Sequence, residues 1–377
     1  MRESIEIQNF GPIDYIKIDE IKPLTIFIGT SGSGKSTIMK VLSLFQWIYK
    51  KSSIRSYLHY SGLKSPFRFH FERLLKDNGL IDYLKSDTEI IYKNGTSTIS
   101  YKNKGLKISP KYVAKDELSL EKIVFISDRR NMIADFSDNS NMKNNFYLSD
   151  TYENYKKASD VLGSFDIDFL DIRLNVKKTK LGTKHQISSI NESRKYLIEL
   201  KHASSGIQNA IPLNTIVEYY SKHYNLVDSI NLSILSYISN TDSYKTFKPI
   251  SNVGEFPNKR VTLFVEEPEL SLFPESQLRL MDFLTNRCFV EAPTDYSMSL
   301  MLATHSPYII NYLNVLIRRS ETNLAYINGN NLAVYRVYEG RLQNLIQYNE
   351  INGRISVNTA DLAEPMSEVL REYRASL

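Results

Sequence analysis

Two patterns of apolar residues along the chain predict two kinds of β-strand. Short runs that are almost wholly apolar are typical of strands covered on both faces of a sheet. Such runs occupy residues 24–28, 123–126, 261–265 and 300–303. Alternation of apolar with polar residues instead predicts partly exposed strands. It predicts edge strands at 5–7 and 16–18, a hairpin of 90–92 with 98–101 around Asn94-Gly95, and further strands at 196–200 and 332–337.

Apolar residues at helical spacing predict the elements between these strands. Ile38, Val41, Leu42 and Phe45 form one face of a helix over 36–47. Further helices are predicted at 207–220, 277–284 and 360–373. Pro212 is expected near the first turn of its helix, where a missing N–H costs little. Because strands and helices alternate, the sequence predicts an α/β fold with a mostly parallel sheet covered on both faces.

Composition narrows the class of protein. At 377 residues, 42% hydrophobic and 24% charged, the chain resembles an average globular protein and neither a disordered nor a membrane protein. It has no apolar run long enough for a membrane span and no signal peptide at its start. A single cysteine, Cys288, excludes internal disulfides. We therefore expect a cytoplasmic protein without membrane contact, whose net charge of +5 permits nucleic-acid binding without indicating it.

A glycine-rich loop lies between the strand at 24–28 and the helix that follows. It reads Gly29-Thr30-Ser31-Gly32-Ser33-Gly34-Lys35-Ser36, with Thr37 next. Two glycines around four residues, followed by Lys-Ser, let backbone N–H groups surround a phosphate at the helix N-terminus. Lys35 is expected to reach the β- and γ-phosphates and Ser36 to hold Mg²⁺. The pattern predicts a P-loop that binds ATP with Mg²⁺, and hence an ATPase.

Two further predicted strands end in residues suited to hydrolysis. Glu266 and Glu267 follow the strand at 261–265, and His305 follows the strand at 300–303. Ligands bind at the carboxyl edge of such sheets. We expect Glu266 to contact the hydration shell of Mg²⁺, Glu267 to be the general base, and His305 to contact the γ-phosphate or the catalytic water.

Four motifs in order carry a resemblance to a known family. Residues 203–208, Ala-Ser-Ser-Gly-Ile-Gln, are by themselves only a good helix-capping sequence. Together with the glycine loop, Glu266-Glu267-Pro268-Glu269 and Thr304-His305-Ser306, they resemble the ATP-binding-cassette (ABC) ATPases of the SMC, RecF and OLD branch. The resemblance covers the ends and centre of the chain and leaves 50–120 and 132–195 unmatched.

The resemblance implies a fold, a division of the chain and a partner. The fold is a P-loop NTPase of the ABC-ATPase head type, with a mostly parallel central sheet, an antiparallel β subdomain and an inserted α/β lid. The division is 1–49 and 196–315 as the two lobes of the head, 50–195 as insertions around a core strand in 121–131, and 316–377 as a C-terminal strand and helix. Ser204, Ser205, Gly206 and Gln208 would bind the nucleotide held by a second copy, in a homodimer or larger assembly.

Within this branch the sequence resembles bacterial anti-phage ATPases of the PARIS and Septu kind. Residues 9–13 resemble their opening strand and residues 125–131 their IPxERN element. Because the segment after Ser306 is too short for a Toprim nuclease domain, the resemblance implies a separate effector, such as a nuclease. Glu266 replaces the usual Walker B aspartate, Ser205 a glycine and Ile207 a glutamine. No Q-loop glutamine can be placed, since Gln46 comes too early.

Several alternatives stay open. A DNA-repair or DNA-associated ATPase of the RecF or SMC kind would need a DNA-binding surface, and a transporter motor is least favoured. Lysine-rich hairpins around Gly105 and Gly182 could hold a phosphate backbone, although lysines also protect edge strands against aggregation. Arg130 is expected either to contact nucleotide or the neighbouring head, or to be an exposed arginine at a strand end.

Overall fold

The computed structural model describes most of the chain, and its centre is a six-stranded sheet. The described residues are 2–63, 67–136, 146–180, 182–191, 193, 195–239, 249, 255–322, 327–349 and 354–375. The sheet contains β3 (Leu24–Ile28), β7 (Ser119–Ile126), β12 (Asn258–Glu266), β13 (Ser297–Thr304), β14 (Leu332–Tyr338) and β15 (Arg341–Asn344). Its order is β15-β14-β3-β13-β12-β7, and every pairing is parallel except that of β14 with β15. The prediction of a mostly parallel central sheet is confirmed.

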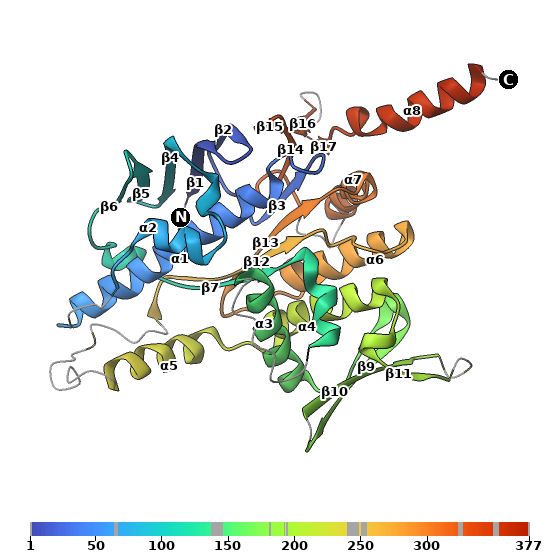
Figure 1. Ribbon diagram of the computed structural model, residues 1–377, viewed down its shortest axis with the longest axis horizontal. Helices are drawn as coiled ribbons and strands as arrows, with labels where there is room; N and C mark the ends of the chain where they lie inside the picture. The colour runs from blue at the N-terminus through green and yellow to red at the C-terminus, as the bar shows by residue number, and fades with distance from the viewer. Residues whose placement is uncertain are drawn as a thin grey trace.

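Helices cover both faces of this sheet, as Figure 1 shows for α1 on one side of β7 and β12, and α3 and α4 on the other. The helices are α1 (Lys35–Tyr60), α2 (Phe71–Asp77), α3 (Phe146–Leu162), α4 (Ser205–Lys222), α5 (Leu226–Ser239), α6 (Pro274–Thr285), α7 (Pro307–Thr322) and α8 (Ala360–Ala375). A π-helix, Asn286–Val290, follows α6 and buries Cys288. In Figure 1, α8 extends away from the rest of the protein toward the C-terminus.

Two helix predictions need correction. Helix α1 continues to Tyr60 instead of ending near 47, because residues such as Ile48, Ile54 and Leu58 keep burying apolar surface along its second half. Helix α4 begins at Ser205, which places Pro212 inside the helix and not in its first turn. Proline removes one backbone hydrogen bond there. The helix continues through it because the surrounding face is buried in the core.

The antiparallel subdomain is a separate five-stranded sheet of order β2-β1-β4-β5-β6. Its strands are β1 (Glu3–Phe10), β2 (Ile13–Ile18), β4 (Leu84–Asn94), β5 (Ser97–Lys102) and β6 (Gly105–Ser109). The predicted hairpin at Asn94-Gly95 is confirmed as β4 and β5. Strand β4 also pairs with β1, with Ile5 opposite Tyr92. Strand β1 is therefore an interior strand and not the predicted edge, and residues 84–109, predicted as insertion, extend this sheet.

A third sheet has the order β11-β10-β9-β8 and is antiparallel. Its strands are β8 (Phe165–Ile167), β9 (Ile172–Thr179), β10 (Gly182–Ser189) and β11 (Leu197–Glu199), and β16 (Ile346–Tyr348) pairs separately with β17 (Ile355–Val357). The strand predicted at 196–200 is the short edge strand β11. The proposed division of the chain into lobes and insertions stays a prediction. Among the described residues, no helix combines the length and apolarity that a bilayer span requires.

A partly buried arginine joins the antiparallel sheet to the central sheet. Arg260, on β12, contacts Glu3 Oε2 at 2.5 Å and Glu121 Oε1 at 3.2 Å. Glu3, on β1, also accepts hydrogen bonds from Gln46 Nε2 at 2.6 Å and the Tyr92 hydroxyl at 2.7 Å. Burial raises the pKa of Glu121, and Arg260 opposes that rise. Gln46 thus holds β1 against α1, which agrees with its exclusion as a Q-loop residue.

We expect Arg260→Leu to lower the free energy of unfolding by about 3–5 kcal/mol, because it leaves two carboxylates buried without their cation. Urea denaturation followed by circular dichroism measures this change. The control Arg279→Leu removes an exposed ion pair with Glu275 on α6 and should cost about 0–1 kcal/mol. Equal losses in the two variants would contradict a joining role for Arg260.

Candidate functional site

The glycine loop, residues 29–36, joins the end of β3 to the start of α1. A Cβ added to Gly29 would lie 2.3 Å from the Val337 carbonyl oxygen of β14, so only glycine fits there. Gly32 and Gly34 have φ angles of 76° and 107°, which side chains rarely adopt. These angles turn the chain into α1, whose first-turn N–H groups have no acceptor within the helix. The loop therefore forms a concave, positive end that suits phosphate oxygens.

Lys35 closes over the loop that precedes it. Its Nζ donates to the carbonyls of Gly29 at 2.8 Å and Thr30 at 2.9 Å, and the residue is 5% exposed. Burial lowers the pKa of Lys35 to about 8, while Glu267 and Glu269 act in the opposite direction. The buried Ser33 hydroxyl has no hydrogen-bond partner among the described residues. A desolvated ammonium and an unpaired donor are both features that a bound phosphate would satisfy.

Ser36 and Glu266 form a compact pair of oxygen ligands. Glu266 ends β12 and is buried, and the Ser36 hydroxyl lies close enough to lower the pKa of its carboxyl. Lys40 Nζ lies 3.3 Å from Glu266 Oε1. Burial raises the pKa of Glu266, and Lys40 and Ser36 oppose that rise. A hydroxyl beside a carboxylate suits Mg²⁺, which is usually held by one or two protein oxygens together with substrate phosphates. The described residues contain no cluster of three or more acidic, histidine or cysteine ligands.

Glu267 and His305 face each other at the carboxyl edge of the sheet. Glu267 Oε1 lies 3.5 Å from His305 Nε2, and the two side chains are 34% and 33% exposed. Glu267 has a φ of 43°, a left-handed backbone conformation that costs about 1–3 kcal/mol. Its N–H donates to the Ala303 carbonyl at 2.7 Å. The Glu269 carboxylate in turn accepts from the His305 N–H at 2.6 Å. A partly exposed carboxylate and imidazole in this arrangement could orient and deprotonate a water molecule.

Arg130 is completely buried. Among the described residues, its guanidinium donates only to backbone carbonyls, including those of Glu266 and Glu267 at 2.7 Å each. The structure therefore excludes an exposed arginine at a strand end. Sequence reasoning missed the contact of Arg130 with the segment after β12. One signal could have suggested this contact: Arg130 comes shortly after β7, and β7 is the neighbour of β12 in the sheet.

The signature segment, residues 204–208, opens α4. Ser204 and Ser205 are exposed, and Ser204 makes no capping hydrogen bond through its side chain. A Cβ on Gly206 would lie 2.6 Å from the Ser271 carbonyl oxygen, so glycine allows α4 to approach the turn after β12. Gln208 Nε2 donates to the Lys201 carbonyl at 2.8 Å. Among the described residues, no hydrogen bond joins this segment to the glycine loop.

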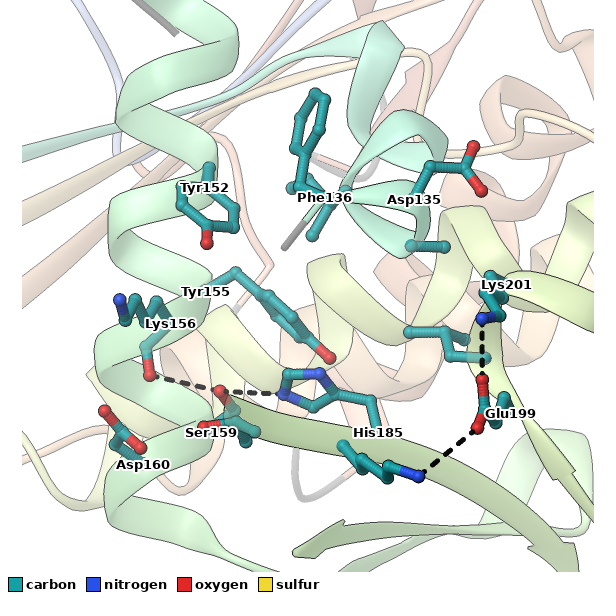
Figure 2. A pocket seen from close by; sticks show the side chains of 15 residues that line it. Asp135, Phe136, Tyr152, Tyr155, Lys156, Ser159, Asp160, His185, Glu199 and Lys201 are labelled. Carbon is teal, nitrogen blue, oxygen red and sulfur yellow. Dashed lines mark hydrogen bonds and ion pairs between the residues drawn. The ribbon is translucent and has the colours of Figure 1, made fainter. Parts of the chain in front are cut away.

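A separate pocket of about 340 Å³ is lined by residues of α3 and β10 and by residues 133–136 and 199–201. Figure 2 shows Tyr155 of α3 and His185 of β10 on one of its sides and Glu199 and Lys201 on another. Glu199 pairs with Lys201 at 2.9 Å and with Lys184 at 4.0 Å. Because these rim charges compensate each other and no residue of the glycine loop lines it, this pocket is not the nucleotide site.

Comparison with known proteins identifies an ATPase domain. Residues 1–160 match the family model described as AAA ATPase domain. This segment contains the glycine loop, Ser36 and β7, so the ATPase prediction is confirmed for this chain. No curated protein matches the sequence significantly.

Two solved structures of SMC heads are similar to the chain. The SMC head bound to the C-winged helix domain of ScpA shares 11% identity, covers 90% of this chain and 95% of its own, and gives a TM-score of 0.40. The SMC head domain from Thermotoga maritima shares 12% identity, covers 91% of this chain and 98% of its own, and gives a TM-score of 0.37. The fold assignment rests on the sheet order and helix positions described above.

We expect Lys35→Ala to abolish ATP hydrolysis, because the loop loses the ammonium that would neutralise the phosphates. Phosphate release from radiolabelled ATP measures the rate. Lys22→Ala is the matched control, since Lys22 lies just before the opposite end of β3 and pairs with exposed Glu20. Normal turnover by Lys35→Ala would remove the glycine loop from the reaction.

Proposed function

We propose that this ATPase hydrolyses ATP at sites completed by a second copy of the chain, and that the ATP state of this assembly controls a separate partner protein in bacterial anti-phage defence. Sites completed by a second copy are supported by the exposed hydroxyls of the signature segment. Ser204 and Ser205 expose hydroxyls that have no hydrogen-bond partner among the described residues. They lie at the positive end of an 18-residue helix, where an anion is favoured.

Within one chain, the remaining roles follow from position. The glycine loop and Thr37 would bind the phosphates, with Lys35 as the cation next to the γ-phosphate. Ser36 and Glu266 would hold Mg²⁺, which neutralises phosphate charge when bound. Glu267 would accept the proton of the attacking water, and His305, 3.5 Å from it, would orient that water or contact the γ-phosphate.

A second copy is needed because the start of α4 makes no hydrogen bond, among the described residues, to the glycine loop of its own chain. The hydroxyls of Ser204 and Ser205 and the N–H groups at the start of α4 could cap a γ-phosphate held by a partner's glycine loop. Gly206 supports this use because it lets α4 pack against the Ser271 carbonyl, beside the acidic turn (residues 266–269). Gln208 would act indirectly, since its amide binds the Lys201 carbonyl of its own chain. The proposed assembly is a homodimer or a larger oligomer with composite sites.

Control of a partner follows from such an assembly. If nucleotide binds only across two heads, it favours the assembled state, and such coupling is typically worth about 1–3 kcal/mol. The motif resemblance to PARIS and Septu ATPases supports a defence role, a cytoplasmic location and a separate effector such as a nuclease. The buried thiol of Cys288 agrees with a reducing compartment.

The DNA-associated alternative gains no support from the lysine-rich hairpins. Lys178 pairs with Asp160 at 3.0 Å and Lys184 lies 4.0 Å from Glu199. Lys102, in the other hairpin, pairs with Glu89 at 2.7 Å. These pairs reduce the positive charge that either hairpin offers to a phosphate backbone. They agree better with protection of exposed strands than with nucleic-acid binding.

We expect Glu267→Gln to bind ATP normally but to hydrolyse it roughly 10²–10⁴-fold more slowly, because an amide cannot accept the water proton. Sedimentation with ATP and Mg²⁺ should then show an accumulated dimer or larger species. Glu275→Gln, which alters an exposed carboxylate at the start of α6, should behave as wild type. Wild-type turnover by Glu267→Gln would show that another group is the base.

Composite sites predict complementation between inactive variants. Ser204→Glu places a negative charge where the partner's γ-phosphate would lie, and Lys35→Ala damages the glycine loop. Mixed in equal amounts, they should recover about a quarter of wild-type activity, since half the dimers are mixed and each has one intact site of two. Mixing Lys35→Ala with the Lys35→Ala Ser204→Glu double variant should recover nothing. Equal rates before and after mixing would indicate sites built within one chain.

A further inference from the structure

Arg130 is a fully buried cation held by backbone carbonyls from three parts of the chain. It belongs to the 3-10 helix η3 (Asp128–Asp135), which follows β7. Its Nε donates to the Asn209 carbonyl of α4 at 3.0 Å. Its Nη1 donates to the carbonyls of Ser127 at 3.1 Å and Glu266 at 2.7 Å, and its Nη2 donates to Glu267 at 2.7 Å and more weakly to Pro268 at 3.5 Å.

This arrangement is specific to a guanidinium. Arginine presents donors in a planar fork, so one side chain can reach Asn209 on one side and the acidic turn on the other. Burial lowers the pKa of Arg130 to about 10, and Glu269, Asp128 and Glu267 counteract that effect. The group therefore stays charged at neutral pH, where charge-assisted hydrogen bonds are stronger than neutral ones.

The contact acts on a non-glycine residue of the site whose backbone conformation is unusual. Glu267 has a left-handed φ of 43°. Its N–H donates to the Ala303 carbonyl of β13, and its own carbonyl accepts from Arg130 at 2.7 Å and from the Leu270 N–H at 3.1 Å. These hydrogen bonds hold both peptide groups that flank the Glu267 side chain. Removing the Arg130 bond would leave the second peptide group with the longer Leu270 bond alone among the described residues, so that it can tilt and move the carboxylate relative to His305, which lies 3.5 Å away.

We propose that Arg130 is a positioning residue that couples the signature helix α4 to the acidic turn, so that Glu267 reaches its working position only when α4 is correctly placed. Asn209 directly follows the signature segment on α4, and its carbonyl shares the guanidinium with the carbonyls of Glu266 and Glu267. A shift of α4 on contact with a partner's nucleotide would reach Glu267 through this one side chain. The inference rests on Glu267 being the base.

The test compares Arg130→Lys with wild type. A lysine keeps the charge, but its single ammonium cannot span Asn209 and the acidic turn together. We expect turnover per bound nucleotide to fall roughly 100-fold, as for displacement of a catalytic group by about an ångström. Affinity for a non-hydrolysable ATP analogue should stay within about threefold of wild type. Because the rate is divided by the number of nucleotides bound, a partly unfolded preparation lowers the stoichiometry and not this rate.

Two controls separate positioning from a general structural role. Arg129→Lys changes the adjacent exposed arginine and should leave every quantity unchanged. In the Glu267→Gln background, adding Arg130→Lys should slow turnover by less than about threefold, because the residue it positions no longer works. If Arg130→Lys binds no nucleotide, Arg130→Gln, which keeps two N–H donors, replaces it in the same comparison.

The outcomes are distinct. Turnover per bound nucleotide within about threefold of wild type, or a full and additive loss in the Glu267→Gln background, would overturn the coupling. If neither Arg130 variant binds nucleotide, Arg130 is a folding residue and the proposal fails. The turnover of Glu267→Gln alone is measured first. If it equals that of the wild type, the assignment of Glu267 as the base is wrong, whatever the Arg130 variants show.

Discussion

The parallel register of β3, β12 and β13 is the constraint on which the site depends. Thr304 lies opposite Ile28, and Glu266 lies opposite Ala303. These pairings make the three strands end at one level, so the next residues along the chain, Gly29, Glu267 and His305, leave the sheet side by side. The register of the strands alone thus brings together residues that are far apart in sequence. A change of register would separate Glu267 from the glycine loop before any side chain was altered.

Two arginines, a partly buried one and a fully buried one, fix the opposite ends of β12 by different means. At its beginning, Arg260 is paired with the carboxylates of Glu3 and Glu121 and holds the antiparallel sheet against the central one. At its end, Arg130 is surrounded by carbonyl dipoles. Carbonyls leave the nearby acidic side chains free of direct bonds to the arginine, so their charge stays available for a cation or a proton. If Arg130 instead formed ion pairs with these acidic side chains, it would neutralise the negative charge that attracts a cation or a proton.

Local patterns in the sequence predicted much of the fold and the site, and contacts between distant residues account for what they missed. The all-apolar strand at 24–28 and the glycine loop specify their own conformation, since Gly32 and Gly34 must adopt positive φ angles. The burial of Arg130 depends on Glu267, 137 residues away, and the interior position of β1 depends on its pairing with β4. The residues that flank Arg130 and β1 in the sequence do not by themselves specify those distant contacts, which become visible once the order of the strands is known. Pro212 was misplaced for the same reason, because buried neighbours and not local propensity extend α4 on both sides of it.

The two halves of the proposed composite site differ in how completely one chain satisfies their polar groups. In the glycine loop, Lys35 already bonds the loop carbonyls, and Glu266 already contacts Ser36 and Lys40. At the start of α4, the hydroxyls of Ser204 and Ser205 face solvent. Water satisfies exposed hydroxyls at little cost, so this half is stable without a partner. Bringing two heads together must overcome the loss of translational and rotational freedom, and a nucleotide bound across both halves supplies the interactions that can do so. Assembly would then report the presence of ATP, and hydrolysis at Glu267 would end it.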